Sequence, residues 1–289
     1  MKDTKGRIVF QCFNYTILTF CMVASLYPVL YVLAASLSSF EFLAQGKVGI
    51  IPMGFNIDAY KRVLAYPMLG RAYLNTIFYV VAGTTISLLM SVLAAYPMSR
   101  RSFFGKKFIT RVVVTAMLFS AGMVPTFLVV TGLGMYNTVW AILLPNAVSS
   151  FNVVILKNFF EQIPYELEES ASLDGCSHMR ILFSIILPLA VPGMVTIGLF
   201  YAVGQWNSYF PAMLYLSDRE LVPLQIILRD IVLQNQTNDL AIDVVAGNDQ
   251  VRESVKYATI MVATIPIMLV YPFIQKYFVK GVMIGSVKG

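Results

Sequence analysis

Residues 161–193 read EQIPYELEESASLDGCSHMRILFSIILPLAVPG, and this stretch joins a polar, acidic half to an apolar half. In the polar half, Pro164 suits the first turn of a helix, and the acids after it place negative charge at the positive end of the helix dipole. Asp174 and Gly175 then supply a stop signal. The pattern predicts a short, separately capped helix over residues 164–176, followed by an apolar segment of a different kind.

The rest of the chain resembles that apolar half. Of its 289 residues, 58% are hydrophobic and only 12% are charged, and long charge-free stretches recur along it. A helix that crosses the hydrocarbon layer needs about 20 apolar residues. The sequence therefore predicts an all-α polytopic membrane protein, a single transmembrane domain over residues 1–289. Six spans are expected near residues 14–37, 72–95, 112–130, 139–156, 181–205 and 258–277.

The basic residues predict the orientation of these spans, because lysine and arginine are retained on the cytoplasmic side. The cluster from Arg100 to Arg111 marks one inner connection. On this basis both termini are cytoplasmic, the helix at 164–176 lies in the cytoplasm between spans four and five, and residues 206–256 form a long outer loop. The net charge of +6 is then a sign of topology and not of nucleic-acid binding.

Residues suited to metal or nucleotide chemistry are sparse. Cys12 and Cys21 fall in the first expected span and Cys176 in a cytoplasmic loop, so neither a structural disulfide nor a metal site is expected. The sequence has no G-x-x-x-x-G-K-[ST] loop that could hold phosphates. We therefore expect no catalytic residues and no cofactor in this chain.

One spacing within the opening stretch is specific, and its residues in order are Glu169, Ser170, Ala171, Gly175, Ile185, Leu187 and Pro188. This spacing resembles the EAA motif of permeases in ATP-binding-cassette importers. Ser170 stands where that family usually has alanine, a change that could alter the fit of the helix to a partner. The segments QWNSYFPAMLYLSDRELVPLQ and KGVMIGSVKG are similar to the carbohydrate-uptake permeases, closest to the class that moves alginate and other oligosaccharides.

The resemblance implies a multi-pass permease subunit of the bacterial cytoplasmic (inner) membrane. Such a subunit forms half of the pathway for a sugar, here an oligosaccharide that is alginate-like or related. It couples closure of the ATPases to alternating access. The implied partners are two ATPase subunits that bind ATP and Mg, a second and different permease, an extracytoplasmic sugar-binding protein and membrane lipid.

The same resemblance assigns roles to three groups of residues. Those expected to couple to the ATPase are Glu168, Glu169, Ser170, Ala171, Asp174, Gly175, Leu187 and Pro188. In the tail, the residues expected between the two ATPases are Gly281, Gly285 and Gly289. In the outer loop, the residues expected to contact the binding protein are Leu214, Tyr215, Leu216, Ser217 and Asp218.

Polar and aromatic side chains within the spans are candidates for the sugar pathway, because rings stack on sugars and amides bind hydroxyl groups. Tyr and Trp near span ends also serve as interfacial anchors, which is the competing interpretation. The candidates are Asn75, Tyr79, Asn146, Asn152, Tyr201, Gln205, Trp206 and Asn207. Small residues, among them Gly83, Gly193 and Gly198, predict close approach of neighbouring helices.

Three alternatives stay open. An ion-coupled secondary transporter would place acids, His or Lys at membrane depth, but no expected span holds a charged residue and His178 lies in the cytoplasmic loop. A membrane-embedded enzyme would need a cluster of catalytic groups near the membrane surface, and the sequence offers none. The third is an ATP-binding-cassette permease for a solute other than a sugar.

Overall fold

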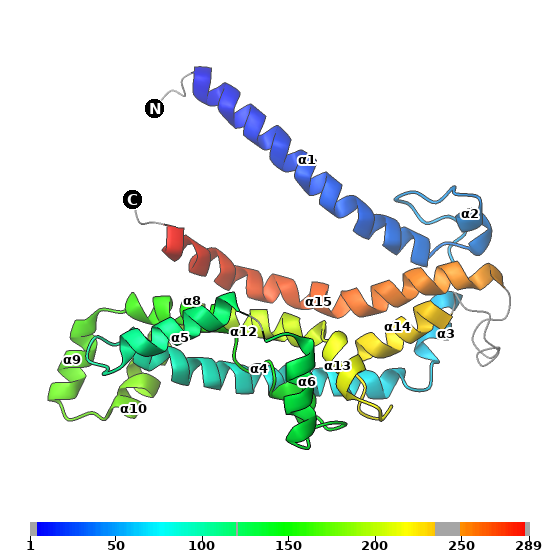
Figure 1. Cartoon of the computed structure of the whole chain (residues 1–289). Helices are drawn as coiled ribbons and strands as arrows, with labels where there is room; N and C mark the ends of the chain where they lie inside the picture. The colour runs from blue at the N-terminus through cyan, green and yellow to red at the C-terminus, as the bar shows by residue number, and fades with distance from the viewer. Residues whose placement is uncertain (1–4, 120, 235–248, 287–289) are drawn as a thin grey trace. The chain divides into compact units, whose positions relative to one another are not determined.

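The computed structural model describes residues 5–119, 121–234 and 249–286, and every regular element within these ranges is helical (Figure 1). The all-α prediction is thus confirmed for this part of the chain. The first elements are α1 (Lys5–Ser36), α2 (Phe40–Ala44), α3 (Asp58–Leu64), α4 (Leu69–Ser99), α5 (Lys106–Leu118), α6 (Met123–Gly132), α7 (Trp140–Leu143) and α8 (Ser150–Glu161). The remainder are α9 (Tyr165–Leu173), α10 (His178–Ile181), a π-helical turn (Leu182–Ile186), α11 (Leu187–Leu189), α12 (Val191–Trp206), α13 (Phe210–Tyr215), α14 (Leu224–Gln234) and α15 (Asp249–Ser286).

Three of these helices are each long and apolar enough to cross a membrane. They are the stretch Val9–Ser36 within α1, the whole of α4, and the stretch Glu253–Pro272 within α15. Two further pairs reach that length only as bent spans, namely α5 with α6, and His178–Leu189 with α12, which meet at 84°. The described residues therefore hold up to five spans by length and composition, and the count of six stays a prediction.

The expected fourth span, at residues 139–156, is divided. Its first part is the short α7 and its second part begins α8, with residues 144–149 between them outside any helix. Pro145 provides the physical reason, because it has no N–H to donate to the carbonyl four residues earlier and so cannot continue the helix. The sequence signal was present, since proline in a span predicts a kink or break.

The bend before α12 also has a local cause. The π-helical turn precedes Pro188, whose missing N–H cannot complete the regular hydrogen-bond ladder. Pro192 then occupies the first turn of α12, where a missing donor costs little. The bend thus falls at Ala190, directly after the Ile185, Leu187 and Pro188 portion of the motif.

The chain divides into two compact units, Met1–Leu69 with Leu228–Pro266, and Gly70–Ile227 with Ile267–Gly289. In the first unit, Ala34, Ala35, Leu43 and Val48 form a small buried cluster. Most of α1 is exposed outside this cluster, with only 6% of its apolar window buried. An apolar helix with so few protein contacts is suited to a lipid environment, in which its backbone groups are satisfied internally.

The second unit has the larger core, made by α4, α8, α9 and the helices from α10 to α12. Fully buried side chains there include Met98, Leu156, Phe160, Ile186 and Ile197. Two glycines let the helices approach closely, as their positions predict. A Cβ on Gly83 would lie 2.6 Å from the amide of Gln205, and one on Gly193 would lie 2.5 Å from the ring of Phe159.

Candidate functional site

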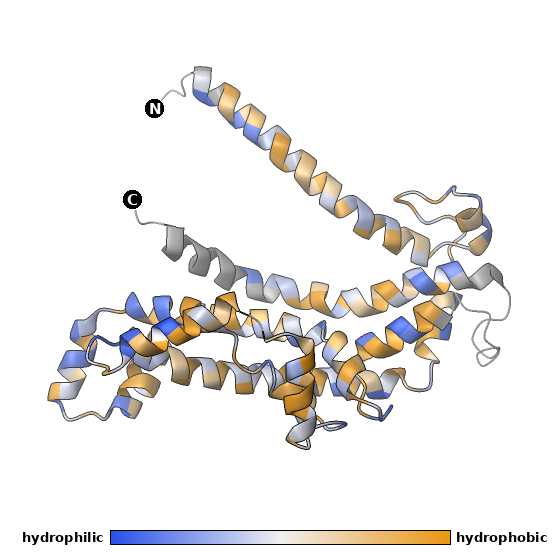
Figure 2. Cartoon of the chain, viewed as in Figure 1, coloured by the Kyte–Doolittle hydropathy of each residue, from blue (hydrophilic) through white to orange (hydrophobic). Residues whose placement is uncertain are grey.

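The short helix α9 follows from the residues that flank it. Pro164 precedes it in an extended conformation, and Glu166 and Glu168 lie in its first turn. After Leu173 the chain turns through Gly175, whose φ of +79° is a left-handed conformation that favours glycine. The amide of Cys176 closes this turn by donating to the carbonyl of Ala171 at 3.0 Å. Figure 2 shows hydrophilic residues on α9 and at the adjoining end of α8.

The two faces of α9 have different surroundings. Glu168 and Ala171 are buried, whereas Glu166, Glu169 and Ser170 are exposed and Leu173 is 85% exposed. Leu167, four residues before Ala171, is 44% exposed. The helix is therefore held by one face and leaves the other open.

The residues expected to couple to an ATPase thus separate into two sets. Glu169, Ser170, Asp174, Gly175 and Pro188 are exposed, while Glu168 and Ala171 point into the subunit. Leu187 is partly buried against the core of the second unit. Only the first set is available to another protein.

The buried face of α9 is held by Arg100, the residue that follows α4. Its guanidinium Nη1 lies 2.5 Å from Oε2 of Glu168, and the two side chains are only 7% and 6% exposed. Nη2 donates to the carbonyl of Phe160 in α8 at 3.1 Å, and Nε donates to Oγ of Ser99 at 3.0 Å. Arg100 therefore ties α4, α8 and α9 together.

The aromatic ring of Tyr96 completes this cluster. The Arg100 guanidinium lies 5.1 Å from the ring centroid, and the Tyr96 hydroxyl donates to Oε1 of Glu168 at 3.4 Å. A buried ion pair overcomes the cost of desolvation only when its remaining donors and acceptors are satisfied. The contacts with Ser99, Phe160 and Tyr96 meet that requirement. We call the five residues Tyr96, Ser99, Arg100, Phe160 and Glu168 the Arg100 cluster.

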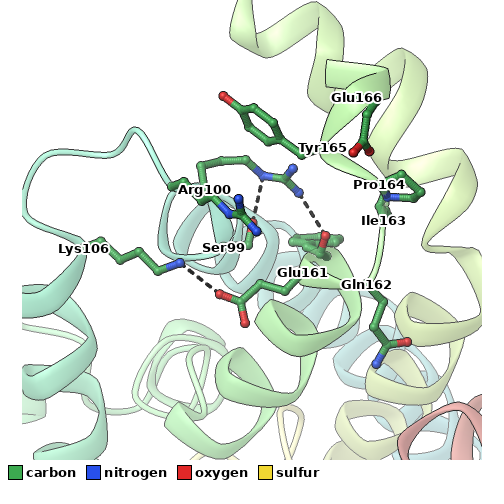
Figure 3. A pocket seen from close by; sticks show the side chains of 11 residues that line it. Ser99, Arg100, Lys106, Glu161, Gln162, Ile163, Pro164, Tyr165 and Glu166 are labelled. Atoms are coloured by element: carbon green, nitrogen blue, oxygen red, sulfur yellow. Dashed lines mark hydrogen bonds and ion pairs between the residues drawn. The ribbon is translucent and has the colours of Figure 1, made fainter. Parts of the chain in front are cut away.

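A cavity of about 460 Å³ lies beside the Arg100 cluster and is seen from close by in Figure 3. Lys106 reaches across from α5 and donates to Glu161 at 3.0 Å, while Lys157 donates to the other oxygen of Glu161 at 2.9 Å. Burial by itself raises the pKa of Glu161, but the hydrogen bonds from Lys157 and Lys106 outweigh burial, so this pKa lies below its ordinary value. Glu161 therefore stays ionised and fixes α5 to α8.

The candidate pathway residues Tyr201, Gln205 and Asn152 are buried among helices. The Tyr201 hydroxyl shares a 2.7 Å hydrogen bond with Ser91 of α4 and accepts the backbone N–H of Ser149 at 3.1 Å. Gln205 packs on Gly83, as described above, and Asn152 lies in the first turn of α8. These contacts join α12 and α8 to their neighbours, which is a packing role.

The remaining pathway candidates are more dispersed. Asn146 is exposed, and the ring centroids of Trp206 and Tyr73 are 6.5 Å apart. The Asn207 amide donates to the Val203 carbonyl at the end of its own helix at 2.9 Å. In the tail, Gly281 and Gly285 fall within α15, and Gly289 lies outside the described residues. The structure does not bring these residues together into one site.

Asn75 and Tyr79 hold a distant segment of the chain, residues 216–224. The Asn75 amide donates to the carbonyls of Glu220 at 2.7 Å and Val222 at 3.0 Å. The Tyr79 hydroxyl donates to the Leu221 carbonyl at 2.8 Å. Because residues four apart share a helix face, α4 presents a row of donors to this segment.

Two more residues of α4 also hold this segment. Thr76 accepts the backbone N–H of Leu224 at 2.8 Å, and both residues are fully buried. Arg71 donates to the carbonyl of Glu220 at 3.4 Å and lies 3.8 Å from its carboxylate. The 216–224 segment is therefore fixed to α4 along three successive turns of that helix.

The residues expected to contact a binding protein lead into this segment. Tyr215 is buried and its ring stacks on Phe127 with centroids 6.0 Å apart. The side-chain oxygen of Asn137, a residue with a φ of +57°, accepts the backbone N–H groups of Ser217 at 2.9 Å and Asp218 at 2.8 Å. The side chain of Asp218 stays exposed.

Sequence reasoning overlooked Arg100 and Asn137. Arg100 appears in the sequence as one of two adjacent arginines after a span, and nothing local separates the buried residue from exposed Arg101. For Asn137 a signal existed, because Asn is one of the few residues that tolerate a left-handed backbone in a turn. Within the described residues, no group of three or more His, Cys, Asp or Glu is placed to hold a metal ion.

Comparisons with known proteins agree on one kind of relative. Residues 83–284 match the family described as "Binding-protein-dependent transport system inner membrane component". The polygalacturonan/rhamnogalacturonan transport system permease protein YtcP of Bacillus subtilis (strain 168) is 44% identical over 287 residues, 99% of this chain and 100% of that protein. Protein LplC of the same strain is 42% identical over 289 residues, 100% of this chain and 98% of that protein.

A solved structure is also similar. It is a chain of a bacterial ABC transporter involved in the import of the acidic polysaccharide alginate, with a TM-score of 0.88 and 34% sequence identity. The match covers 96% of this chain and 99% of that chain.

Proposed function

The chain belongs to the family of binding-protein-dependent transport system inner membrane components, and we propose that it is the permease subunit of an ABC importer for a sugar. It is a multi-pass protein of the bacterial inner membrane and a transport component, not an enzyme. The names of its relatives refer to polysaccharides, which supports an oligosaccharide, alginate-like or related, as the cargo.

The topology that fits this function has six spans with both termini in the cytoplasm. A single permease domain then extends over residues 1–289, with α9 on the cytoplasmic side and residues 206–256 on the outer side. The positively charged stretch after α4, which includes Arg100, Arg101 and Lys106, supports this orientation because basic residues stay inside. The 216–224 segment and α9 then lie on opposite sides of the membrane.

The partners follow from the family. A binding protein delivers the sugar at residues 214–218, a second permease completes the pathway, and two ATPases supply the energy. ATP and Mg bind those ATPases, since this chain has no phosphate-binding loop of its own. The tail around Gly281, Gly285 and Gly289 extends between them.

The observation that carries the proposal is the asymmetry of α9. One face is fixed to the subunit by Glu168 and Ala171, and the opposite face presents Glu169, Ser170 and Leu173. A helix built in this way can be inserted into a groove of an ATPase and can pass the movement of that groove to the spans. Nucleotide acts by favouring one of the two states of the pore.

The test is Glu169→Lys in cells that express the complete importer. We expect the ATPases no longer to copurify with this chain and uptake of labelled oligosaccharide to be lost, because the reversed charge meets the docking groove. Glu41→Lys makes the same charge change in another short helix, α2, at an exposed position. This control should leave both readouts unchanged. Normal assembly and uptake with Glu169→Lys would contradict the coupling role.

A secondary transporter driven by ions is the competing function. It predicts that uptake continues when the partner ATPases cannot hydrolyse ATP and stops when the ion gradient is dissipated. The permease predicts the reverse result for both treatments. Competition by unlabelled non-sugar solutes distinguishes the remaining alternative, a permease of the same family with another cargo.

A further inference from the structure

The helix α4 is attached at both of its ends to segments that the proposed function places on opposite sides of the membrane. At one end, Asn75, Thr76 and Tyr79 hold the 216–224 segment through four hydrogen bonds of 2.7–3.0 Å. At the other end, Tyr96 of α4 and Arg100, which follows it, hold Glu168 of α9. These two attachments use different chemistry but the same helix.

Between its two ends α4 is one continuous helix of 31 residues, which at a rise of 1.5 Å per residue is about 46 Å long. Its middle is packed closely on α12. Ser91 bonds to Tyr201, Gly83 lies against Gln205, and a Cβ on Gly198 would meet the side chain of Leu88 at 3.2 Å. A helix supported in this way moves as a rigid body more readily than it bends, because packed interiors deform little.

We propose that α4 is the strut that links the binding-protein side of the subunit to its ATPase side. Its outer joint is the row Asn75, Thr76 and Tyr79, and its inner joint is the Arg100 cluster. A push on the 216–224 segment displaces α4 along or about its axis, and the ion pair with Glu168 carries that displacement to α9. This inference rests on the proposed function, in which a binding protein contacts one end and an ATPase the other.

A role in this joint accounts for the partners of Asn75 and Tyr79, which are backbone carbonyls. Their polar groups do not face an open pathway. Because the accepting oxygens belong to the main chain, the 216–224 segment cannot shift without also moving the side chains that donate to it. At the inner joint, the buried charges of Arg100 and Glu168 cannot separate without a large penalty, because each would lose its ion-pair partner in the interior. Both joints therefore couple α4 to its neighbours, the inner joint more strongly than the outer one.

The experiment measures ATP hydrolysis by the reconstituted importer in lipid nanodiscs, with and without sugar-loaded binding protein. Tyr79→Phe removes the bond to Leu221, and Tyr96→Phe removes the bond to Glu168 without exposing a charge. We expect each variant to assemble with its ATPases and to keep its basal hydrolysis. Stimulation by the binding protein should fall roughly fivefold in each, the effect of about one net hydrogen bond on an equilibrium.

The double variant Tyr79→Phe/Tyr96→Phe tests whether the two hydroxyls act through the same helix. If both hydroxyls act through the same strut, the loss in the double variant differs from the product of the two single losses, whereas independent sites give that product. Tyr15→Phe, at an exposed position of α1, is the matched control and should behave as the unmodified chain. Normal stimulation in either single variant, or losses that multiply in the double variant, would overturn the strut. An unmodified importer that shows no stimulation by any binding protein would instead refute the proposed function, and the strut with it.

Discussion

The α9 helix and the 216–224 segment are both short and both attached to α4, but the attachments differ in kind. α9 is held by a buried ion pair, and the 216–224 segment mainly by neutral hydrogen bonds to its backbone, with Arg71 as an exposed charged donor beside them. A neutral hydrogen bond can be exchanged for water at modest cost, whereas an unpaired buried charge cannot. The attachment of α9 is therefore built to stay formed, whereas the attachment of the 216–224 segment can be loosened one bond at a time.

The largest expected effect comes from breaking the buried ion pair. Arg100→Met leaves the Glu168 carboxylate without its partner in the interior and should lower the free energy of unfolding by about 3–5 kcal/mol. Denaturant titration of the purified complex in detergent measures it. Arg101→Met is the control at the exposed neighbouring arginine, where we expect almost no change.

A double substitution tests whether this loss of stability is electrostatic. In Arg100→Met/Glu168→Met the charge is removed from both partners, and well-packed apolar side chains commonly replace a buried pair at little cost. We therefore expect the double variant to recover most of the lost stability. If the double variant is as unstable as Arg100→Met alone, the loss comes from packing and the contrast between the two attachments is not electrostatic.

A smaller effect is expected at Asn137, which holds the start of the 216–224 segment. Asn137→Gly keeps the left-handed backbone but removes the oxygen that accepts two backbone N–H groups. Hydrogen exchange at Ser217 and Asp218 should become roughly fivefold faster, since a lost hydrogen bond is worth about 1 kcal/mol. Asn137→Ala should be faster still, because it adds the strain of a positive φ.

Equal exchange rates in Asn137→Gly and Asn137→Ala would show that backbone strain at residue 137 is unimportant. If neither variant changed exchange at residues 217 and 218, the segment would be held by Tyr136 and Tyr215 instead. Tyr136 shares a 2.7 Å hydrogen bond with Ser217, and the Tyr215 carbonyl accepts the Asn137 N–H at 2.9 Å. Exchange at amides of α9 serves as the internal reference.

The two regions also differ in how far the sequence predicts them. For α9, Pro164, the acids in the first turn and Gly175 are local signals, and they place the helix within one to three residues of its observed ends. The apolar, charge-free stretches likewise predict α1 and α4, because lipid selects such residues directly. These features depend on neighbours in sequence.

The contacts that define the site depend instead on residues that are far apart in the sequence. Arg100 and Glu168 are 68 residues apart, and Tyr79 is 142 residues from Leu221. No local pattern indicates that a polar residue near the end of a span bonds to the main chain of a remote loop, so the sequence predicts Asn75 and Tyr79 only as candidates for the sugar pathway. The division of residues 139–156 is intermediate, since Pro145 signals a break but not how far apart the two parts lie.

The smallest effect is expected at Glu161, which offers a partly exposed ion pair for comparison with the buried one. Its pKa is lowered, so the folded state favours the carboxylate, and this stabilisation is present above the unfolded pKa of about 4.3. It is lost as the pH falls through the lower folded pKa. Glu161→Gln should therefore cost at most about 1 kcal/mol at pH 7 and make stability less dependent on pH below about 4.5.

The measurement is denaturant titration of the purified complex from pH 7 to pH 3.5, with the unmodified chain beside Glu161→Gln. Between pH 7 and pH 5 both curves should be parallel, because about all of the carboxylate is ionised in the folded and unfolded states there. Below that range they should converge as the unmodified chain loses its ion pairs with Lys106 and Lys157. A loss at pH 7 as large as that of Arg100→Met would mean that exposure does not separate the two ion pairs, and the distinction between a closed and a loosened attachment would then need another physical cause.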